Sequence, residues 1–190
     1  FAGANAVGVV SSKDKINYVK SLGAKGVINR KDFDCWGELP DVSDIKAYGQ
    51  YIEKVKEFGK AIWEFTGKYI AVDTVFEHPG GQTFPVSCFV VKRGGLVVYC
   101  AATSGYNLTF DARYGWMHQK RIQGSHFATL KQAAEANKLV INKNIQPCMS
   151  EVLSWKDIPE AHMKMKRNEH KPGNMAVLVQ AKKPGMKTLK

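Results

Sequence analysis

Short apolar runs alternate along the chain with stretches of helical periodicity, and this alternation restricts the fold more than any other feature of the sequence. The first three apolar runs are predicted as buried strands over Ala6–Ser11, Gly26–Asn29 and Ala71–Phe76. Between them, apolar residues recur every three or four positions over residues 13–22 and 45–65, which predicts two amphipathic helices. Strands that alternate with helices form a parallel sheet covered by helices. We therefore predict an α/β fold with a doubly wound, Rossmann-type sheet.

Polar and glycine residues interrupt the pattern between these elements. The polar stretch over residues 30–44 is expected to be a surface loop or insertion, and the long helix over 45–65 is expected to break near Gly59. The alternation then continues with a short helix over 83–91, a turn at Gly94–Gly95, strands over 96–101 and 122–127, and a helix over 130–141.

The character of the sequence changes beyond Pro147. An extended stretch over residues 151–155 is followed by a predicted helix over 158–166 and a strand over 175–180. We therefore divide the chain into a nucleotide-binding domain over 1–146 and a small C-terminal segment over 147–190.

The glycine-rich phosphate loop of a doubly wound sheet is absent from this sequence. A GxGxxG motif should lie between the first strand and the first helix of such a sheet, and none precedes Ala6. Residues 1–4 are instead predicted to be the end of a helix, with Gly3 at its stop. We expect the missing strand and its loop to lie upstream of residue 1. That strand would run between the strands that begin at Ala6 and Ala71.

The composition excludes several classes of function. The net charge of +11 would suit nucleic acid, but Lys and Arg are spread along the chain and no nucleic-acid-binding motif accompanies them. We expect a solvated basic surface that also suits small polyanionic ligands. No apolar run is long enough to cross a membrane. The cysteines form no CxxC pair and the histidines no HExxH motif, so we predict no metal site, no disulfide framework and a cytoplasmic location.

The residues after the first predicted strand indicate the cofactor. Ligands of a doubly wound sheet bind at the carboxyl ends of the strands, and an NAD site normally places an acid directly at this strand end. This sequence has Ser11, Ser12 and Lys15 there, which can bind a 2′-phosphate by charge-assisted hydrogen bonds. We therefore expect NADP. In the alternative interpretation, Ser12 only caps the next helix and the lysine is solvated.

Several motifs resemble those of crotonyl-CoA carboxylase/reductases, which belong to the medium-chain dehydrogenase superfamily. The most specific are VFEHPG over Val75–Gly80 and GSHFA over Gly124–Ala128. The resemblance covers almost the whole chain and includes VVSS with Lys15, ATSGY over Ala102–Tyr106, RYGWM over Arg113–Met117 and AEANKL over Ala134–Leu139.

This resemblance implies an oxidoreductase that uses NADPH. NADPH would give a hydride to the β-carbon of a 2-enoyl-CoA, and the resulting enolate would take CO₂ at its α-carbon to form a 2-alkylmalonyl-CoA. The C-terminal segment would belong to the catalytic domain, whose N-terminal half would lie on the same or a separate polypeptide. The chain alone would then be inactive, and the assembled enzyme would be a homo-oligomer.

The resemblance also implies roles for individual residues. His126 matches the family histidine that holds CO₂ by hydrogen bonding, although a histidine at such a position is more commonly a core residue bonded to a backbone carbonyl. Arg113, Lys120 and Arg121 could meet CoA phosphates, or be ordinary surface charges. The expected cofactor contacts are Phe76, Glu77 and His78 after the third strand, with Ala101, Thr103, Ser104 and Gly105 after the fourth.

Three other functions remain open. The first is a non-carboxylating NADPH-dependent enoyl-CoA or quinone reductase of the same superfamily. The second is a non-catalytic assembly domain, which the absent phosphate loop favours. The third and most distant is a nucleic-acid-binding protein, which salt-dependent retention on DNA would reveal.

Overall fold

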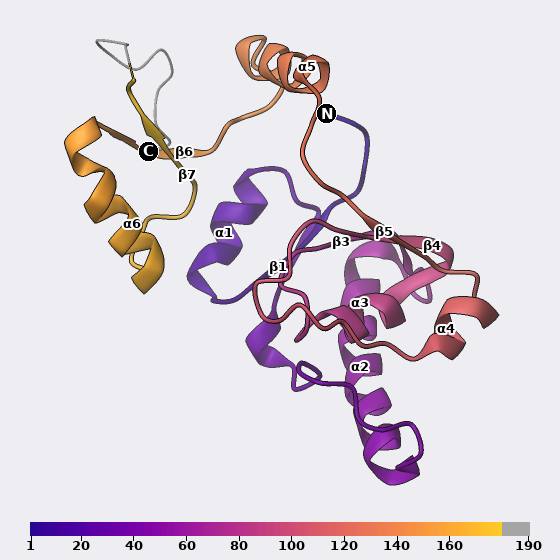
Figure 1. Cartoon of the computed structure of the whole chain (residues 1–190). Helices are drawn as coiled ribbons and strands as arrows, with labels where there is room; N and C mark the ends of the chain where they lie inside the picture. Colours follow the sequence, from indigo (N-terminus) through magenta and orange to yellow (C-terminus); the bar gives the residue numbers. More distant parts are fainter. Residues whose placement is uncertain (180–190) are drawn as a thin grey trace. The chain divides into compact units, whose positions relative to one another are not determined.

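The computed structural model describes residues 1–179, and its contacts divide the chain into two compact units (Figure 1). The first unit comprises residues 2–127 and the second begins at Ala128. The division therefore falls before the last predicted helix of the nucleotide-binding domain, and the functional boundary at residue 146 stays a prediction. No helix within residues 1–179 is long and apolar enough to cross a membrane.

The first unit contains two separate parallel sheets. Strands β1 (Val7–Val10) and β2 (Gly26–Asn29) pair in parallel and are connected by helix α1 (Asp14–Ser21). The second sheet has the order β3-β4-β5, with β3 over Val72–Glu77 and β4 over Val91–Tyr99. Its remaining elements are α3 (Phe84–Val90), α4 (Ala112–Met117) and β5 (Arg121–Gly124).

These sheets confirm the predicted parallel α/β fold. No strand pairing within residues 1–179 connects the two sheets, and β1 and β3 lie in different sheets. Each of these two strands thus keeps one edge without a partner strand among the described residues, which agrees with the prediction that a central strand is missing between them. Residues 1–6 form no helix or strand in the structure, so the predicted helix end is not found, although Gly3 has the positive φ of +77° that a helix stop requires.

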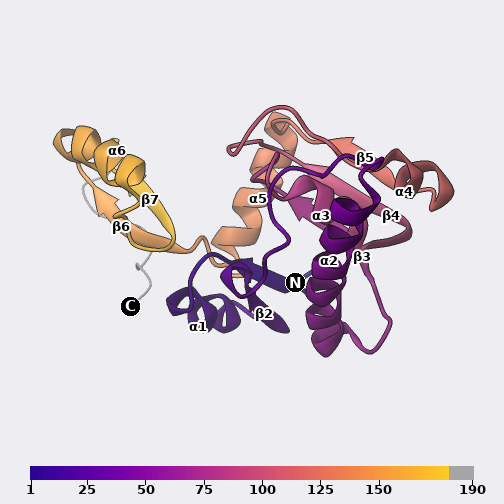
Figure 2. The same ribbon diagram turned by 90° about the horizontal axis from the view of Figure 1, so that it is seen from below.

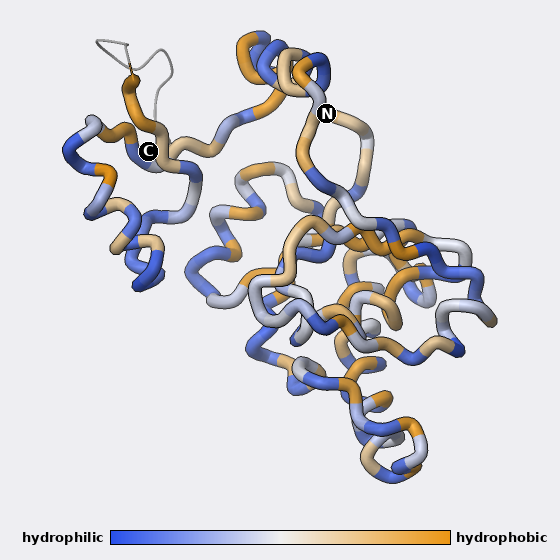
Figure 3. The backbone as a smooth tube through the Cα atoms, in the orientation of Figure 1, coloured by the Kyte–Doolittle hydropathy of each residue, from blue (hydrophilic) through white to orange (hydrophobic). Residues whose placement is uncertain are grey.

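Helix α2 (Ile45–Thr66) organises the larger core of this unit. Its N-terminus is capped by the Asp44 side chain, which accepts a hydrogen bond from the Ala47 amide at 2.9 Å. Hydrophobic and hydrophilic residues alternate along it (Figure 3), and both ribbon views place it beside α3 (Figure 2). Its buried stripe consists of Tyr51, Val55, Phe58 and Ile62, which pack against Ile28 of β2 and Val86 of α3.

One prediction about this region is wrong, and a second is correct only in part. The helix continues through Gly59, because packing along the buried stripe outweighs the weak helix propensity of glycine. Gly59 itself takes no part in this packing, since nothing lies within 4 Å of the place that a Cβ would take. The stretch over residues 30–44 is largely a loop, but it is not a simple surface loop. Cys35 is 1% exposed, and Phe33, Trp36 and Leu39 pack against the same core.

The second sheet has one covered face and one open face. Val97 is fully buried and belongs to a smaller core with Phe84 and Cys88 of α3. Because neighbouring residues of a strand point to opposite faces, Phe76 lies on the other side of the sheet, where it is 69% exposed. The predicted turn at Gly94–Gly95 is wrong, because both glycines lie within β4, where the pairing with β3 shifts register between Val72↔Val91 and Thr74↔Leu96.

The second unit agrees closely with the predicted elements. Helix α5 (Leu130–Ile141) has the predicted bounds and begins with a capping box in which Thr129 and Gln132 exchange hydrogen bonds. The remaining elements are β6 (Met149–Leu153), α6 (Ile158–Arg167) and β7 (Asn174–Val177), and β6 and β7 pair in parallel. The last predicted strand residue, Gln180, lies outside the described residues.

Candidate functional site

The carboxyl ends of β3, β4 and β5 bring most of the predicted site residues to one edge. In the parallel register Glu77 pairs with Tyr99, and Tyr99 pairs with Gly124. The Ser125 amide then donates to the Tyr99 carbonyl at 2.8 Å. The segments that follow these strands, including His126, therefore begin side by side, as ligand-binding loops of doubly wound sheets do.

The loops after β3 and β4 are bonded into one unit, which we call the strand-end platform (residues 77–83 and 100–105). The Ser104 amide and hydroxyl both donate to the Pro79 carbonyl, at 2.7 and 2.8 Å, and the Gly81 amide donates to the Gly105 carbonyl at 3.3 Å. Gly80 has a φ of +90°, and a Cβ there would lie 2.7 Å from the Ala102 Cα. Only glycine allows the two loops to approach this closely.

Two predicted cofactor contacts, the buried Glu77 and the exposed Ser104, have side-chain polar atoms that are hydrogen-bonded within the protein. The Glu77 side chain is 3% exposed and accepts hydrogen bonds from the Gly80 amide at 3.0 Å, from the Thr83 hydroxyl at 2.6 Å and from the Ser87 hydroxyl. The Ser104 hydroxyl, besides its donation to Pro79, accepts from the Gln82 amide at 3.1 Å. The polar atoms of both side chains thus already have partners within the protein, and the expectation that these residues contact a cofactor stays a prediction.

Other members of the predicted set face outward. Phe76, His78 and Thr103 are exposed, and Ala101 and Gly105 are partly exposed. Gly105 has a φ of +145°, which favours glycine and leaves its backbone uncovered by a side chain. Small residues of this kind leave the backbone uncovered, which allows a flat ligand to approach closely.

His126 is exposed at the end of the β5 segment and contacts Phe127, with ring centroids 3.9 Å apart. No hydrogen-bond partner is found for its imidazole within residues 1–179. The alternative that His126 is a core histidine bonded to a carbonyl is therefore wrong. Its ring nitrogens are available to a ligand.

The ends of β1 and β2 form a second group. Val10 pairs with Asn29, so Ser11–Lys15 and Arg30–Lys31 follow neighbouring strand ends. A hydrogen bond from Ser12 is the largest of the effects that hold the pKa of Asp14 below its ordinary value, and the charges of Lys15 and Lys31 act in the same direction. Sequence reasoning missed Arg30 and Lys31, because only the register of the two strands brings them beside Ser11.

Ser12 does not act as the helix cap that the alternative interpretation required. Helix α1 begins at Asp14 with Lys13 in the capping position, and the Lys13 side chain makes no capping hydrogen bond. The Ser12 hydroxyl instead bonds to Asp14. The charges of Lys15 and Lys31 and the Ser12 hydroxyl thus act on the Asp14 carboxylate at the start of α1, while Ser11 and Arg30 directly follow the paired ends of β1 and β2.

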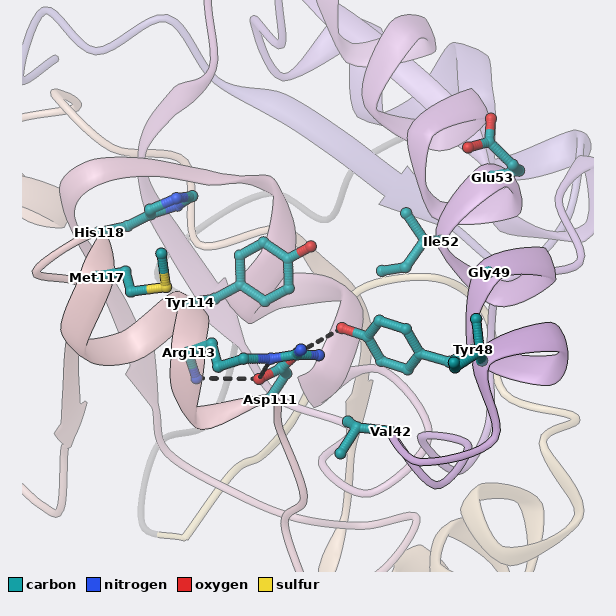
Figure 4. Close-up of a pocket in the computed structure, with 11 residues that line it drawn as sticks. Val42, Tyr48, Gly49, Ile52, Glu53, Asp111, Arg113, Tyr114, Met117 and His118 are labelled. Atoms are coloured by element: carbon teal, nitrogen blue, oxygen red, sulfur yellow. Dashed lines mark hydrogen bonds and ion pairs between the residues drawn. The ribbon is translucent and has the colours of Figure 1, made fainter.

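A groove of about 590 Å³ lies between α2 and α4 (Figure 4). Asp111 is 8% exposed at its base, and Arg113 binds it through Nε at 2.9 Å and Nη2 at 2.6 Å. The Tyr48 hydroxyl also donates to Asp111, at 2.5 Å. The Arg113 hydrogen bonds lower the pKa of Asp111 to about 2, although burial acts in the opposite direction.

The three residues suggested as CoA contacts differ in availability. Lys120 donates to the Cys88 and Phe89 carbonyls at the end of α3, at 2.7 and 2.8 Å, and burial lowers its pKa to about 8. It is therefore engaged inside the protein. Arg113 is half-exposed beside Asp111, and Arg121 is exposed. Of the three residues, Lys120 would have to break its hydrogen bonds to α3 to bind a phosphate, whereas the two arginines would not.

The described residues contain no group of three or more His, Cys, Asp and Glu side chains that could hold a metal ion. All four cysteines are free, and Cys35 and Cys88 are buried. Burial raises the pKa of both thiols to about 12. The predicted absence of a metal in the complete protein stays a prediction.

Comparison with known proteins confirms the resemblance inferred from the motifs. A curated crotonyl-CoA carboxylase/reductase from Cereibacter sphaeroides is 64% identical over 98% of this chain and 43% of its own length. A solved crotonyl-CoA carboxylase/reductase shares 61% identity over 98% of this chain and 43% of that chain, with a TM-score of 0.91.

A solved 2-octenoyl-CoA carboxylase reductase, CinF, in complex with NADP and 2-octenoyl-CoA, is 36% identical over 97% of this chain and 40% of that chain, with a TM-score of 0.80. The chain thus spans less than half of the length of these relatives. The family model described as zinc-binding dehydrogenase matches residues 1–142, which include both parallel sheets of the first unit and every predicted site residue. The chain therefore belongs to the zinc-binding dehydrogenase family.

Proposed function

We propose that this chain provides the NADP-binding part of an enzyme that reductively carboxylates a 2-enoyl-CoA. The observation that carries the proposal is the 64% identity, over 98% of the chain, to a crotonyl-CoA carboxylase/reductase. The product would be a 2-alkylmalonyl-CoA. The enoyl-CoA and CO₂ would be the substrates, and an N-terminal catalytic half would supply the remaining walls of the site.

The ends of β1 and β2 suit NADP rather than NAD. The 2′-phosphate would lie beside Ser11, Ser12 and Lys15, with Arg30 and Lys31 contributing from the neighbouring strand. Asp14 would oppose this binding, since its carboxylate lies among the cations. Asp32 adds a second carboxylate after β2, but Lys15, Arg30 and Lys31 still outnumber the two acids, so the net field favours a phosphate.

The strand-end platform suits the remainder of the cofactor. His78, Thr103 and the backbone of Ala101–Gly105 face outward and would line the cofactor where the platform is exposed. Bound NADPH would supply the hydride for the β-carbon of the enoyl thioester, and the double-bond electrons would then form the new bond between the α-carbon and CO₂. His126, exposed and without a hydrogen-bond partner within residues 1–179, would hold CO₂ by donating a hydrogen bond.

A full-length chimera tests the proposal. Residues 1–190 would replace the matching segment of the Cereibacter relative, and oxidation of NADPH would be followed with crotonyl-CoA, with and without bicarbonate. We expect turnover that requires crotonyl-CoA and a carboxylated product when bicarbonate is present. The isolated chain serves as control and should be inactive. Absence of any crotonyl-CoA-dependent NADPH oxidation by the chimera would refute the proposal.

The same experiment separates the alternatives. A protonated product at every bicarbonate concentration would indicate a non-carboxylating enoyl-CoA reductase. Failure of the chimera to bind NADPH would indicate an assembly domain. Within the proposal the enzyme is a homo-oligomer in the cytoplasm, which the mass of the native particle and cell fractionation would test.

A further inference from the structure

Glu77 is a buried carboxylate that the proposed chemistry does not use. It is the last residue of β3, it is 3% exposed, and none of the ion pairs found among residues 1–179 includes it. A buried carboxylate without a cation is costly unless several donors bind it. Glu77 has three such donors, so its place in the fold requires an explanation.

Two of the three donors belong to the segment that leads from β3 into α3, and the third, Ser87, lies within α3. One oxygen accepts from the Gly80 amide at 3.0 Å and from the Thr83 hydroxyl at 2.6 Å, and the other accepts from the Ser87 hydroxyl. The Thr83 amide in turn donates to the Gly80 carbonyl at 2.9 Å. Glu77 therefore fixes the course of the first loop of the platform from within.

The first loop then fixes the second. A Cβ on Gly80 would lie 2.8 Å from the Ala102 Cβ and 3.0 Å from the Gly105 carbonyl oxygen, so Gly80 lies directly against that loop. Ser104 connects the two loops through Pro79 and Gln82, with contacts between 2.7 and 3.1 Å. A shift of Gly80 towards the second loop would therefore displace Ala102 and Gly105, and the Ser104 bonds transmit movement of the first loop to the second.

We propose that Glu77 is a positioning residue for hydride transfer, acting through the loop over 78–83 to set the position of residues 101–105. This inference rests on the proposed function, because those residues are the ones that would line the cofactor. Hydride transfer depends steeply on the distance between the reacting atoms, so a loop displaced by a fraction of an ångström lowers turnover without abolishing binding.

The test uses the full-length chimera and measures turnover per bound NADPH. We expect Glu77→Ala to lower kcat by about tenfold or more while the Kd for NADPH changes less than about threefold, because binding depends less on exact geometry than hydride transfer does. Thr83→Val removes one donor and keeps the side-chain shape, so it should lower kcat in the same direction if Glu77→Ala fails to fold. The primary isotope effect with deuterated NADPH should rise in both variants.

Glu77→Gln should retain at least about a third of wild-type kcat, because the amide keeps one acceptor and can donate to Ser87. Asp73→Ala is the matched control, since Asp73 is an exposed carboxylate near the opposite end of β3 and should leave kcat unchanged. The inference is overturned if Thr83→Val, or Glu77→Ala where it folds, keeps wild-type turnover and isotope effect per bound NADPH. It is also overturned if Glu77→Gln loses as much as Glu77→Ala, since that would mean direct action of the charge. An inactive wild-type chimera would instead refute the proposed function.

Discussion

Lys31 follows β2, and the parallel pairing of β1 with β2 carries it to the end of β1. Its charge acts on Asp14, which lies in the first turn of α1. A 2′-phosphate bound beside Ser12 would therefore lie within reach of Lys31. This residue would then contribute to the choice of NADP over NAD, although no sequence motif marks it.

We predict that Lys31→Met in the full-length chimera raises the KM for NADPH by about fivefold, which corresponds to about 1 kcal/mol for an exposed charge pair. The KM for NADH should not change, because NADH has no 2′-phosphate. Steady-state kinetics with both cofactors measures the ratio. Lys25→Met is the control, since Lys25 precedes β2 at the other end of the strand. Equal changes for NADPH and NADH would contradict the prediction.

Asp111 supports a second prediction at the residue scale. Hydrogen bonds from Arg113 and Tyr48 lower the pKa of Asp111 to about 2. A folded-state pKa below the unfolded value means that the carboxylate stabilises the fold above about pH 4 and loses this effect as the pH falls towards 2. Because the Arg113 side chain is 54% exposed, we expect Asp111→Asn to cost about 1–2 kcal/mol at pH 7 rather than the full amount implied by the shift.

Urea unfolding of wild type and Asp111→Asn at several pH values checks this prediction. The difference in unfolding free energy should narrow as the pH falls from about 4 towards 2, because the wild-type carboxylate becomes protonated. Glu53→Gln is the control, since Glu53 forms only an exposed pair with Lys56 and should change stability by less than about 0.5 kcal/mol. A difference that stays constant with pH would show that the ionised carboxylate is not responsible.

At the residue scale the sequence predicts the types of side chain at the site better than their directions. The strand ends and the residues after them can be located from the pattern, because ligand-binding loops follow parallel strands. Glu77 is held inward by donors further along its own segment, and Ser104 bonds to the neighbouring loop; no local pattern reveals either set of contacts. Arg30 and Lys31 depend likewise on the register between β1 and β2.

Among the helices, α2 shows how packing overrides local propensity. Gly59 predicts a break, yet the helix runs unbroken from Ile45 to Thr66. The spacing of Tyr51, Val55, Phe58 and Ile62 supplies a continuous buried stripe. Helix α4 could not be predicted from the sequence, because its six residues include Gly115 and are too few to show a helical periodicity.

We predict that Gly59→Ala stabilises the chain by about 0.5–1 kcal/mol, because nothing lies within 4 Å of the added methyl group and alanine is the better helix former. Gly26→Ala is the matched variant, for which we expect the opposite effect on stability. A Cβ at Gly26 would collide with the ring of Phe65, the residue that brings the end of α2 onto β2, and should cost about 1–3 kcal/mol.

Urea unfolding followed by tryptophan fluorescence measures both changes, since Trp36 packs against Phe58 of α2 and Trp63 is part of the helix. Both variants add the same methyl group, so a difference between them reflects only the surroundings of the two glycines. A loss of stability in both variants would contradict the prediction, because it would mean that α2 requires flexibility at Gly59.

At the scale of the whole molecule, the separation of the two sheets is the feature that the proposed function must explain. Strands β1 and β3 each have an unpaired edge among residues 1–179. Unpaired strand edges in a native protein are normally covered or paired. Val9 of β1 and Phe76 of β3 are 49% and 69% exposed, so apolar surface accompanies the open edges. A strand supplied by the N-terminal half would pair with both edges and join the sheets.

Hydrogen exchange tests this expectation on the isolated chain and on the full-length chimera. The amides of Val7–Val10 and Val72–Glu77 that point away from β2 and β4 should exchange at least about tenfold more slowly in the chimera, because each gains a backbone acceptor. The amides of β4 provide the internal control, since that strand already has β3 and β5 as neighbours and should change much less. Equal protection of β1, β3 and β4 would point to general stabilisation by the added half. Unchanged exchange at β1 and β3 would mean that the sheets stay apart, and the cofactor would then have to bind without a strand between them.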